Sequence, residues 1–200
     1  MLFRSRAVVD WDQGTRGDPL FDFATLLSYW VHPDDPPAMH DMAQMPAVEA
    51  RLCPRAEAVA AYARASGLPT LADDSGLEVA ALDGAPGVYT RRYAGANATD
   101  VQNYEKLLAA TVGVADRSAR FVCTMALVDP IDGSERTFRG ECRGSLTTAP
   151  RGTFGFGYDP IFEVDGRTMA ERPPAEKDAL SHRGRAAALV AAALRSELQP

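Results

Sequence analysis

The stretch LADDSGLEVAALDGAPGVYTRRYAG, residues 71–95, decides how the fold is interpreted. Two runs within or beside it, TLADD (70–74) and LEVAAL (77–82), have the composition of short strands. Ser75-Gly76 separates them, and glycine permits a sharp change of chain direction. We therefore predict two strands joined by a tight turn, with acidic residues at the end of the first strand.

Two adjacent carboxylates, Asp73 and Asp74, come directly before that turn. Carboxylates at a strand end can hold a hard cation and orient a water molecule. Side chains alternate between the faces of a strand, so only one of the two can face a given pocket. A solvated turn is the competing interpretation, because Asp, Ser and Gly are common turn residues.

The sequence downstream predicts a helix followed by a hairpin. Thr99 and Gln102 form a capping box that begins the helix. ARFVCTMALV (119–128) and SERTFRGECRGSL (134–146) are strand-like runs on either side of Asp132-Gly133, a hairpin signal.

The C-terminal part predicts one more strand and two helices. Asp159-Pro160 precedes a short strand, and Pro173-Pro174 precedes a short helix. Ser181 caps a long helix that runs to about Leu198. Strands that alternate with helices, together with one hairpin, predict an α/β fold with a mixed sheet.

Glycines alternate with aromatic residues in TFGFGYDP, residues 153–160. Such glycines let the backbone approach a flat ligand while an aromatic ring stacks on it. A loop whose aromatic side chains anchor it to the core is an equally good interpretation of the same residues.

A third cluster consists of Lys177 and Ser181-His182-Arg183. If Ser181 is the N-cap, His182 and Arg183 lie on the first helical turn, where free N–H groups and cationic side chains suit an acceptor-rich ligand. An ordinary surface histidine is the alternative. Ser181 and His182 do not form a nucleophile–base pair, because adjacent residues at a helix start do not face each other.

The composition excludes several classes of protein. The 200 residues carry a net charge of −6, which disfavours a nucleic-acid-polymer binder because such proteins need a basic face. No stretch approaches the ~18 apolar residues of a membrane span, and the N-terminus lacks a signal-peptide core. Three cysteines without metal-type spacing, Cys53, Cys123 and Cys142, are typical of buried thiols in a reducing cytosol. We expect a cytoplasmic protein.

The first third of the chain has a different pattern. AVVD (7–10) predicts a short strand, and Asp18 begins a helix with an apolar stripe. A boundary is expected near Pro46. Residues 47–65 are rich in alanine and predict a helix that Gly67 ends.

Three separated motifs follow one another along the chain: the 71–95 stretch, GFGYDPIF (155–162) and EKDALSHRGRA (176–186). Together they resemble the inosine triphosphate pyrophosphatases, also called XTP/dITP diphosphatases, and the resemblance covers about residues 64–196. It implies an elongated mixed β-sheet flanked by helices and a homodimer. It also implies Mg²⁺-dependent hydrolysis of ITP, dITP and XTP to the monophosphate and pyrophosphate.

The resemblance also assigns roles to individual residues. Asp74 would be the general base and a metal ligand, with Asp73 beside it as a second ligand. The substrate would be bound by residues from all three motifs: Ser75, Phe156, Gly157, Tyr158, Asp159, Lys177, His182 and Arg183. Phe156 would stack on the purine. Lys177, His182 and Arg183 would recognise its 6-oxo group.

The N-terminal residues depart from that family. Residues 1–63 contain no counterpart of three family features. These are the opening strand, the phosphate-gripping loop of the type Thr-Gly-Asn-x-x-Lys, and a later Glu-Asn pair. AVVDWDQGTRGDPLFDFATLLSYWVHPDDP (7–36) instead resembles the late part of aminoglycoside-phosphotransferase-like kinases, with Asp10 at the place of a metal-binding aspartate. The resemblances predict a phosphotransferase-like fragment over 1–46 and a pyrophosphatase-like domain over 47–200 that lacks its first strand.

Three interpretations of function follow. The first is a working pyrophosphatase, and the second is a catalytically impaired nucleotide-binding protein of the same fold. The third is a fragment of a small-molecule phosphotransferase, which is disfavoured because phosphoryl transfer needs groups from both lobes of a kinase.

Overall fold

The computed structural model describes residues 30–31, 45–46, 59, 63–64 and 67–197. The chain divides into two compact units, one of residues 1–73 with 125–137 and one of residues 74–124 with 138–200. The expected strand at 7–10 and the helix begun by Asp18 lie outside the described residues, as does Cys53. The boundary near Pro46 stays a prediction.

Two local features of the first unit are described. Strands β1 (Trp30–Val31) and β2 (Met45–Pro46) pair in parallel, with Trp30 opposite Met45. Gly67 has a φ of 64° and donates its N–H to the carbonyl of Ala63 at 3.0 Å, so it ends the preceding helical turn as predicted.

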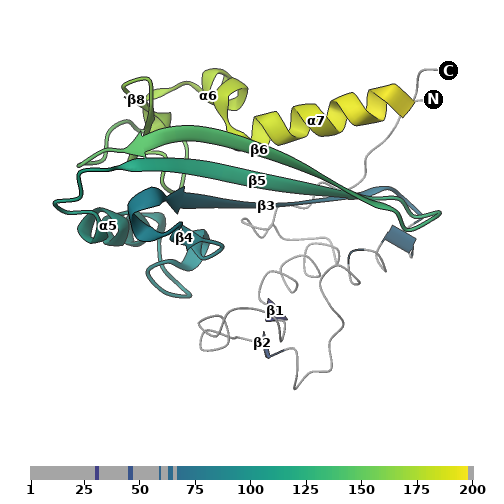
Figure 1. Ribbon diagram of the computed structural model, residues 1–200, viewed down its shortest axis with the longest axis horizontal. Coiled ribbons are helices and arrows are strands. Elements are labelled where there is room, and N and C mark those ends of the chain that lie inside the picture. Colours follow the sequence, from purple (N-terminus) through teal and green to yellow (C-terminus); the bar gives the residue numbers. More distant parts are fainter. Residues whose placement is uncertain (1–29, 32–44, 47–58, 60–62, 65–66, 198–200) are drawn as a thin grey trace. The chain divides into compact units, whose positions relative to one another are not determined.

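A six-stranded sheet runs through the structure in the order β4-β3-β5-β6-β7-β8 (Figure 1). Its strands are β3 (Thr70–Val79), β4 (Pro86–Gly87), β5 (Ser118–Val128), β6 (Glu135–Leu146), β7 (Phe162–Val164) and β8 (Arg167–Thr168). The pairs β3–β4, β6–β7 and β7–β8 are antiparallel, and β5 and β6 form the predicted hairpin. The α/β fold is therefore confirmed.

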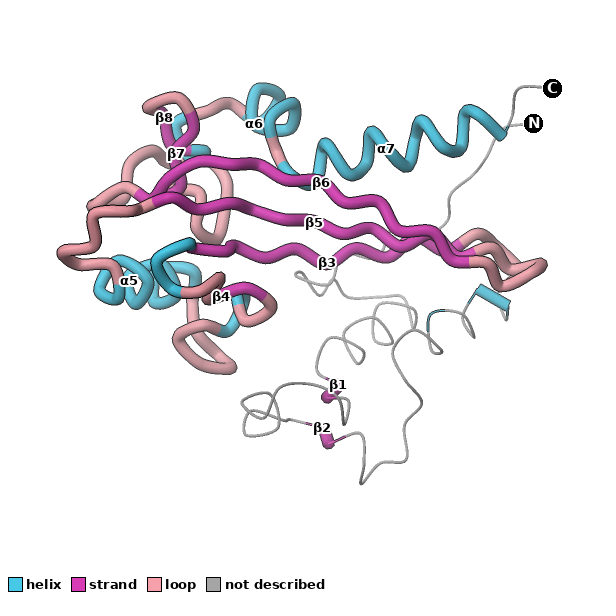
Figure 2. The backbone as a smooth tube through the Cα atoms, viewed as in Figure 1, coloured by secondary structure: helices cyan, strands magenta, loops and turns pink. Residues whose placement is uncertain are grey.

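The predicted turn at Ser75-Gly76 is wrong. Figure 2 shows β3 as one unbroken strand through both residues, and a 3₁₀ turn over Ala80–Leu82 follows it. A Cβ at position 76 would lie 2.5 Å from the carbonyl oxygen of Gly87 on the neighbouring strand. Glycine is needed here because another backbone comes close, and the chain continues straight. Asp73 and Asp74 therefore lie in the middle of a strand.

Three helices of the second unit were predicted correctly. The capping box of Thr99 and Gln102 begins α5 (Asp100–Ala110). Ser181 separates α6 (Pro174–Leu180) from α7 (His182–Glu197). Figure 1 shows α6 and α7 on the β6 side of the sheet and α5 on the β3 side. None of the described helices is long and apolar enough to cross a membrane.

The core of this unit joins the sheet to both groups of helices. Leu77 of β3, Leu107 of α5 and Phe162 of β7 are fully buried in it. Cys123 and Cys142 are buried free thiols, as expected from the cysteine pattern. Short 3₁₀ turns over Thr90–Arg92 and Met169–Glu171 complete the loops around the core.

Candidate active site

Residues 153–160, called the aromatic loop below, are anchored at two points. The N–H of Gly157 donates to Oδ2 of Asp100 at 2.7 Å, at the start of α5. The hydroxyl of Tyr158 donates to the carbonyl of Thr90 at 2.8 Å. Burial raises the pKa of the Tyr158 hydroxyl, so this group stays protonated and remains a donor. The loop is thus held rigidly against elements distant in sequence.

Asp159 organises the loop from within. Its Oδ2 accepts a hydrogen bond from the N–H of Phe156 at 2.8 Å. Gly155 has a φ of 78°, and a Cβ there would lie 2.1 Å from the same carboxylate oxygen. A side chain at position 155 would therefore strain the backbone and displace Asp159.

Lys177 of α6 connects this carboxylate to the Phe156 ring. Its Nζ lies 2.5 Å from Oδ2 of Asp159 and 4.5 Å from the centroid of the ring. The two charged side chains are only 16% and 7% exposed, whereas Phe156 is 49% exposed. An ammonium over an aromatic face is attractive, and it fixes the ring while leaving much of its surface accessible.

The start of α7 contributes His182 and Arg183. Ser181 is the N-cap, because its Oγ accepts from the N–H of Gly184 at 2.9 Å. The same hydroxyl donates to the carbonyl of Asp178, which agrees with the prediction that Ser181 and His182 are not a catalytic pair. Burial, assisted by the charges of Arg183 and Lys177, lowers the pKa of His182 to about 3. His182 is therefore neutral at physiological pH.

The predicted acidic cluster, Asp73-Asp74 with Ser75, lies in β3. Asp74 is exposed, while Asp73 and Ser75 are half-buried. The Oγ of Ser75 and the Nδ1 of His182 are buried and have no hydrogen-bond partner among the described residues. Within that described part, no group of three His, Cys, Asp or Glu side chains gathers to hold a metal ion. The catalytic and metal-binding roles of Asp74 stay predictions.

Two residues of this site were missed by sequence reasoning. Asp100 has a local signal, since acidic residues favour the first turn of a helix, but nothing local reveals its bond to Gly157, 57 positions away. Thr90 donates to the carbonyl of Gly87 at 2.6 Å and accepts from the N–H of Leu77 at 2.8 Å. It thereby joins β3 and β4 to the aromatic loop.

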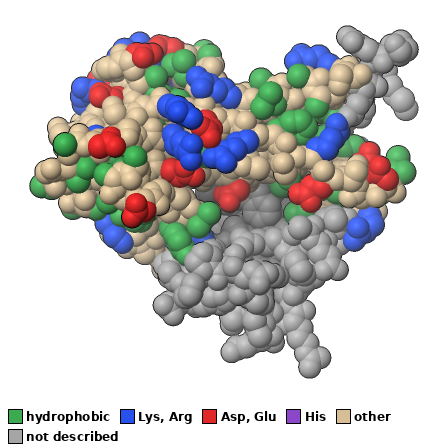
Figure 3. Space-filling model, viewed as in Figure 1, with side chains coloured by type: hydrophobic (Ala, Val, Ile, Leu, Met, Phe, Trp, Pro, Cys, Tyr) green, Lys and Arg blue, Asp and Glu red, His purple; other side chains and the backbone are tan. Residues whose placement is uncertain are grey.

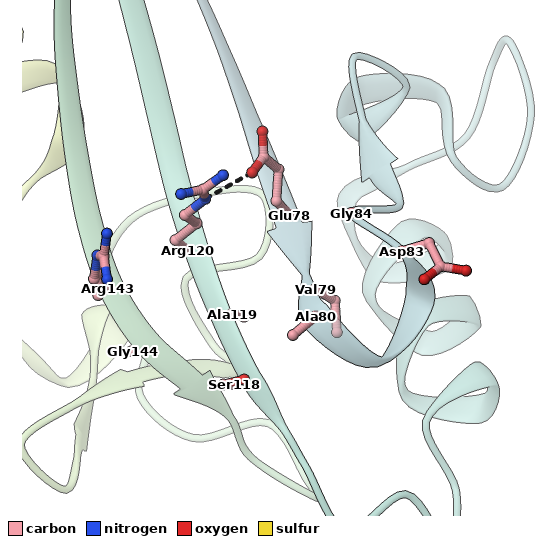
Figure 4. A pocket seen from close by; sticks show the side chains of 10 residues that line it. All are labelled: Glu78, Val79, Ala80, Asp83, Gly84, Ser118, Ala119, Arg120, Arg143 and Gly144. Atoms are coloured by element: carbon pink, nitrogen blue, oxygen red, sulfur yellow. Dashed lines mark hydrogen bonds and ion pairs between the residues drawn. The ribbon is translucent and has the colours of Figure 1, made fainter.

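A hollow lies elsewhere in the described part of the chain. It is on what we call the charged sheet face, which consists of Glu78, Arg120, Arg139, Glu141 and Arg143. Figure 3 shows basic and acidic side chains gathered together near the middle of the view. The hollow of about 680 Å³ is lined by Glu78, Arg120 and Arg143, with Glu78 bonded to Arg120 at 2.7 Å (Figure 4). None of the predicted site residues lines it. Partly exposed ion pairs of this kind are common on solvated surfaces, so we place the candidate site at the aromatic loop.

The chain also matches known protein families. The model of the Ham1 family matches residues 37–193, and that of the phosphotransferase enzyme family matches residues 2–56. A dITP/XTP pyrophosphatase of Syntrophobacter fumaroxidans is 57% identical over 62% of the chain, and one of Geobacter sulfurreducens is 55% identical over 64%. The chain spans 54% and 66% of the lengths of these two relatives.

Solved structures of Ham1 proteins also match this chain. The Staphylococcus aureus Ham1 protein matches with a TM-score of 0.67 and 42% identity, covering 72% of this chain and 76% of that one. A HAM1 protein of Coxiella burnetii matches with a TM-score of 0.66 and 45% identity, covering 70% and 74%. This partial coverage fits the expectation that the first strand of the fold is missing.

Proposed function

The chain belongs to the Ham1 family, and on that premise we propose that it hydrolyses non-standard purine nucleoside triphosphates. ITP, dITP and XTP would be converted to the monophosphate and pyrophosphate, which would clear deaminated purines from the nucleotide pool. The dITP/XTP pyrophosphatases similar to this chain support the proposal, as does the aromatic loop.

The observation that carries the proposal is that the Phe156 ring is both accessible and fixed in position. Its ring is half-exposed, yet Lys177, Asp159 and the backbone of the loop hold it in place. A fixed and accessible aromatic face is suited to stacking against a purine, and stacking does not depend on which base is present. Gly157, Tyr158 and Asp159 would complete this wall.

Base selection would come from polar groups that point at the purine edge. His182, Arg183 and Lys177 are candidates for reading the 6-oxo group, and Ser75 offers a buried hydroxyl without a described partner. A donor aimed at an oxo group would face an amino group in ATP and be left unpaired. An unpaired buried donor is costly, so the normal nucleotide would be rejected.

The chemical step would be carried by Asp74. Its carboxylate would take a proton from a water molecule as the water oxygen attacks the α-phosphorus and the bond to the pyrophosphate oxygen breaks. The oxygen donors of Asp73 and Asp74 suit Mg²⁺, which commonly binds through one or two carboxylates together with substrate phosphates. Bound there, the ion would neutralise phosphate charge.

A homodimer in the cytoplasm is the proposed form of the protein, by resemblance to the family. The alternative function is nucleotide binding with poor turnover. It is motivated by residues 1–63, where the family's phosphate-gripping loop has no counterpart. Calorimetric binding of IMP without pyrophosphate release from ITP would favour that alternative.

The test compares two carboxylates of one strand. Asp74→Asn should lower kcat for pyrophosphate release from ITP by at least ~10²-fold, because a general base contributes about that much. Glu78→Gln is the matched control: it is also in β3 and removes an ion pair with Arg120, but it should leave the rate unchanged. Equal rates for Asp74→Asn and the parent, with folding intact, would rule out the role of Asp74.

A further inference from the structure

A phenylalanine outside the three sequence motifs lies flat against the imidazole of His182. The ring of Phe121, in β5, stacks on His182 with centroids 4.8 Å apart and an interplanar angle of 12°. The ring of Phe162 meets Phe121 nearly edge-on, at 4.8 Å and 71°. Phe121 is only 9% exposed, so its own orientation is fixed by the core.

Among the described residues, one nitrogen of this histidine lacks the contact that usually orients an imidazole. In many sites a hydrogen bond at one ring nitrogen fixes the plane of the ring and its tautomer. Here Nδ1 of His182 is buried and has no hydrogen-bond partner among the described residues. The stack on Phe121 is therefore a contact that orients the plane of this ring.

The backbone of His182 is fixed as well. A Cβ at Gly140 of β6 would lie 2.1 Å from the carbonyl oxygen of His182 and 2.5 Å from the nitrogen of Ala186. The missing side chain lets α7 approach the sheet closely, so the first turn of the helix cannot shift without moving the sheet. With the backbone held by β6 and the ring held by β5, the imidazole has little freedom.

We propose that Phe121 is a positioning residue for base selection, which holds the plane of His182 so that a neutral imidazole nitrogen meets the 6-substituent edge of the purine. This rests on the proposed function. Burial lowers the pKa of His182 to about 3, which agrees with recognition by a neutral ring. A tilted ring would still lie in the site but would distinguish 6-oxo from 6-amino purines less well, because hydrogen-bond strength depends on direction.

The experiment measures kcat/KM for ITP and ATP in the full chain with three substitutions. Phe121→Leu removes the flat ring, Phe121→Tyr keeps it, and Phe162→Leu removes a ring from the same cluster that meets Phe121 only edge-on. Phe121→Leu should lower the ITP/ATP ratio by about 3- to 10-fold, the effect of losing an aromatic pair. Phe121→Tyr should restore the ratio, and Phe162→Leu should leave it near that of the parent.

A spectroscopic readout tests the stack directly. In proton NMR spectra the imidazole C–H signals of His182, assigned by their loss in His182→Gln, should move downfield in Phe121→Leu and return in Phe121→Tyr. Unmoved signals, or equal loss of selectivity in Phe121→Leu and Phe162→Leu, would overturn the positioning role. A parent that does not distinguish ITP from ATP would instead overturn the proposed function, and this inference with it.

Discussion

The aromatic loop and the charged sheet face both bring opposite charges together, but in different surroundings. At the loop, Lys177 and Asp159 are 16% and 7% exposed, and their contacts reach the Phe156 ring. On the sheet face, Arg120 is 39% exposed and Arg143 is 79% exposed. A buried ion pair commits its neighbours to one arrangement, whereas an exposed pair is screened by solvent and contributes little.

The difference shows why a hollow by itself does not identify the site. The hollow of about 680 Å³ lies over the charged sheet face, where the arginines are already paired with Glu78 and Glu141. The aromatic loop combines an accessible ring with polar groups that its own contacts hold in place. Pre-organised groups of this kind are what a binding site requires.

The largest effect is expected from breaking the buried ion pair of Lys177 and Asp159. Lys177→Met should lower the free energy of unfolding by about 3–5 kcal/mol, because it leaves the Asp159 carboxylate buried without its cation. Urea unfolding measures the loss. Arg120→Met on the charged sheet face is the matched control and should cost far less. Similar losses in the two variants would show that the two regions do not differ as described.

Removing the stacking ring should have the next largest effect. Phe156→Ala should weaken binding of both IMP and AMP by ~1–3 kcal/mol in calorimetry, since stacking does not depend on the 6-substituent. Phe154→Ala is the matched control: Phe154 is also 49% exposed in the same loop, but Lys177 lies over Phe156. Equal losses from both substitutions would contradict a specific role for Phe156.

A pH experiment tests the surroundings of His182. The pKa of His182 is about 3 in the folded chain, below its ordinary value of 6.5, so between these values the unfolded chain binds the extra proton. Stability should therefore fall as pH decreases from about 6.5, by up to ~1.4 kcal/mol per pH unit from this residue. His182→Gln should reduce that slope in urea unfolding curves, and an unchanged slope would contradict the burial of the ring.

The smallest expected effect is on the charged sheet face itself. Arg143→Ala should leave both stability and ITP turnover near the parent's values, because the side chain is exposed and its contact with Glu141 is 3.4 Å long. Unfolding curves at low and high salt would check this. A clear loss of ITP turnover in Arg143→Ala would move the site toward this face.

Sequence reasoning failed where a distant contact decided the local structure. Asp-Asp-Ser-Gly has the composition of a turn, but Gly76 lies in a continuous strand that pairs with its neighbour, and its missing side chain lets the backbone of Gly87 come close. The same limit applies to Asp100, whose bond to the aromatic loop joins residues 57 positions apart. Turn propensity is a local preference, and pairing with neighbouring strands outweighed it.

The sequence alone determined the features that depend on near neighbours. The capping box of Thr99 and Gln102, the N-cap at Ser181 and the β5–β6 hairpin each form among residues a few positions apart, so local pattern was sufficient. The tertiary structure decided which side chains meet: Lys177 with Asp159 and Phe156, and Phe121 with His182. These contacts depend on how the sheet, the loop and α6 and α7 pack together, and packing follows from burial of the whole core rather than from any short stretch of chain.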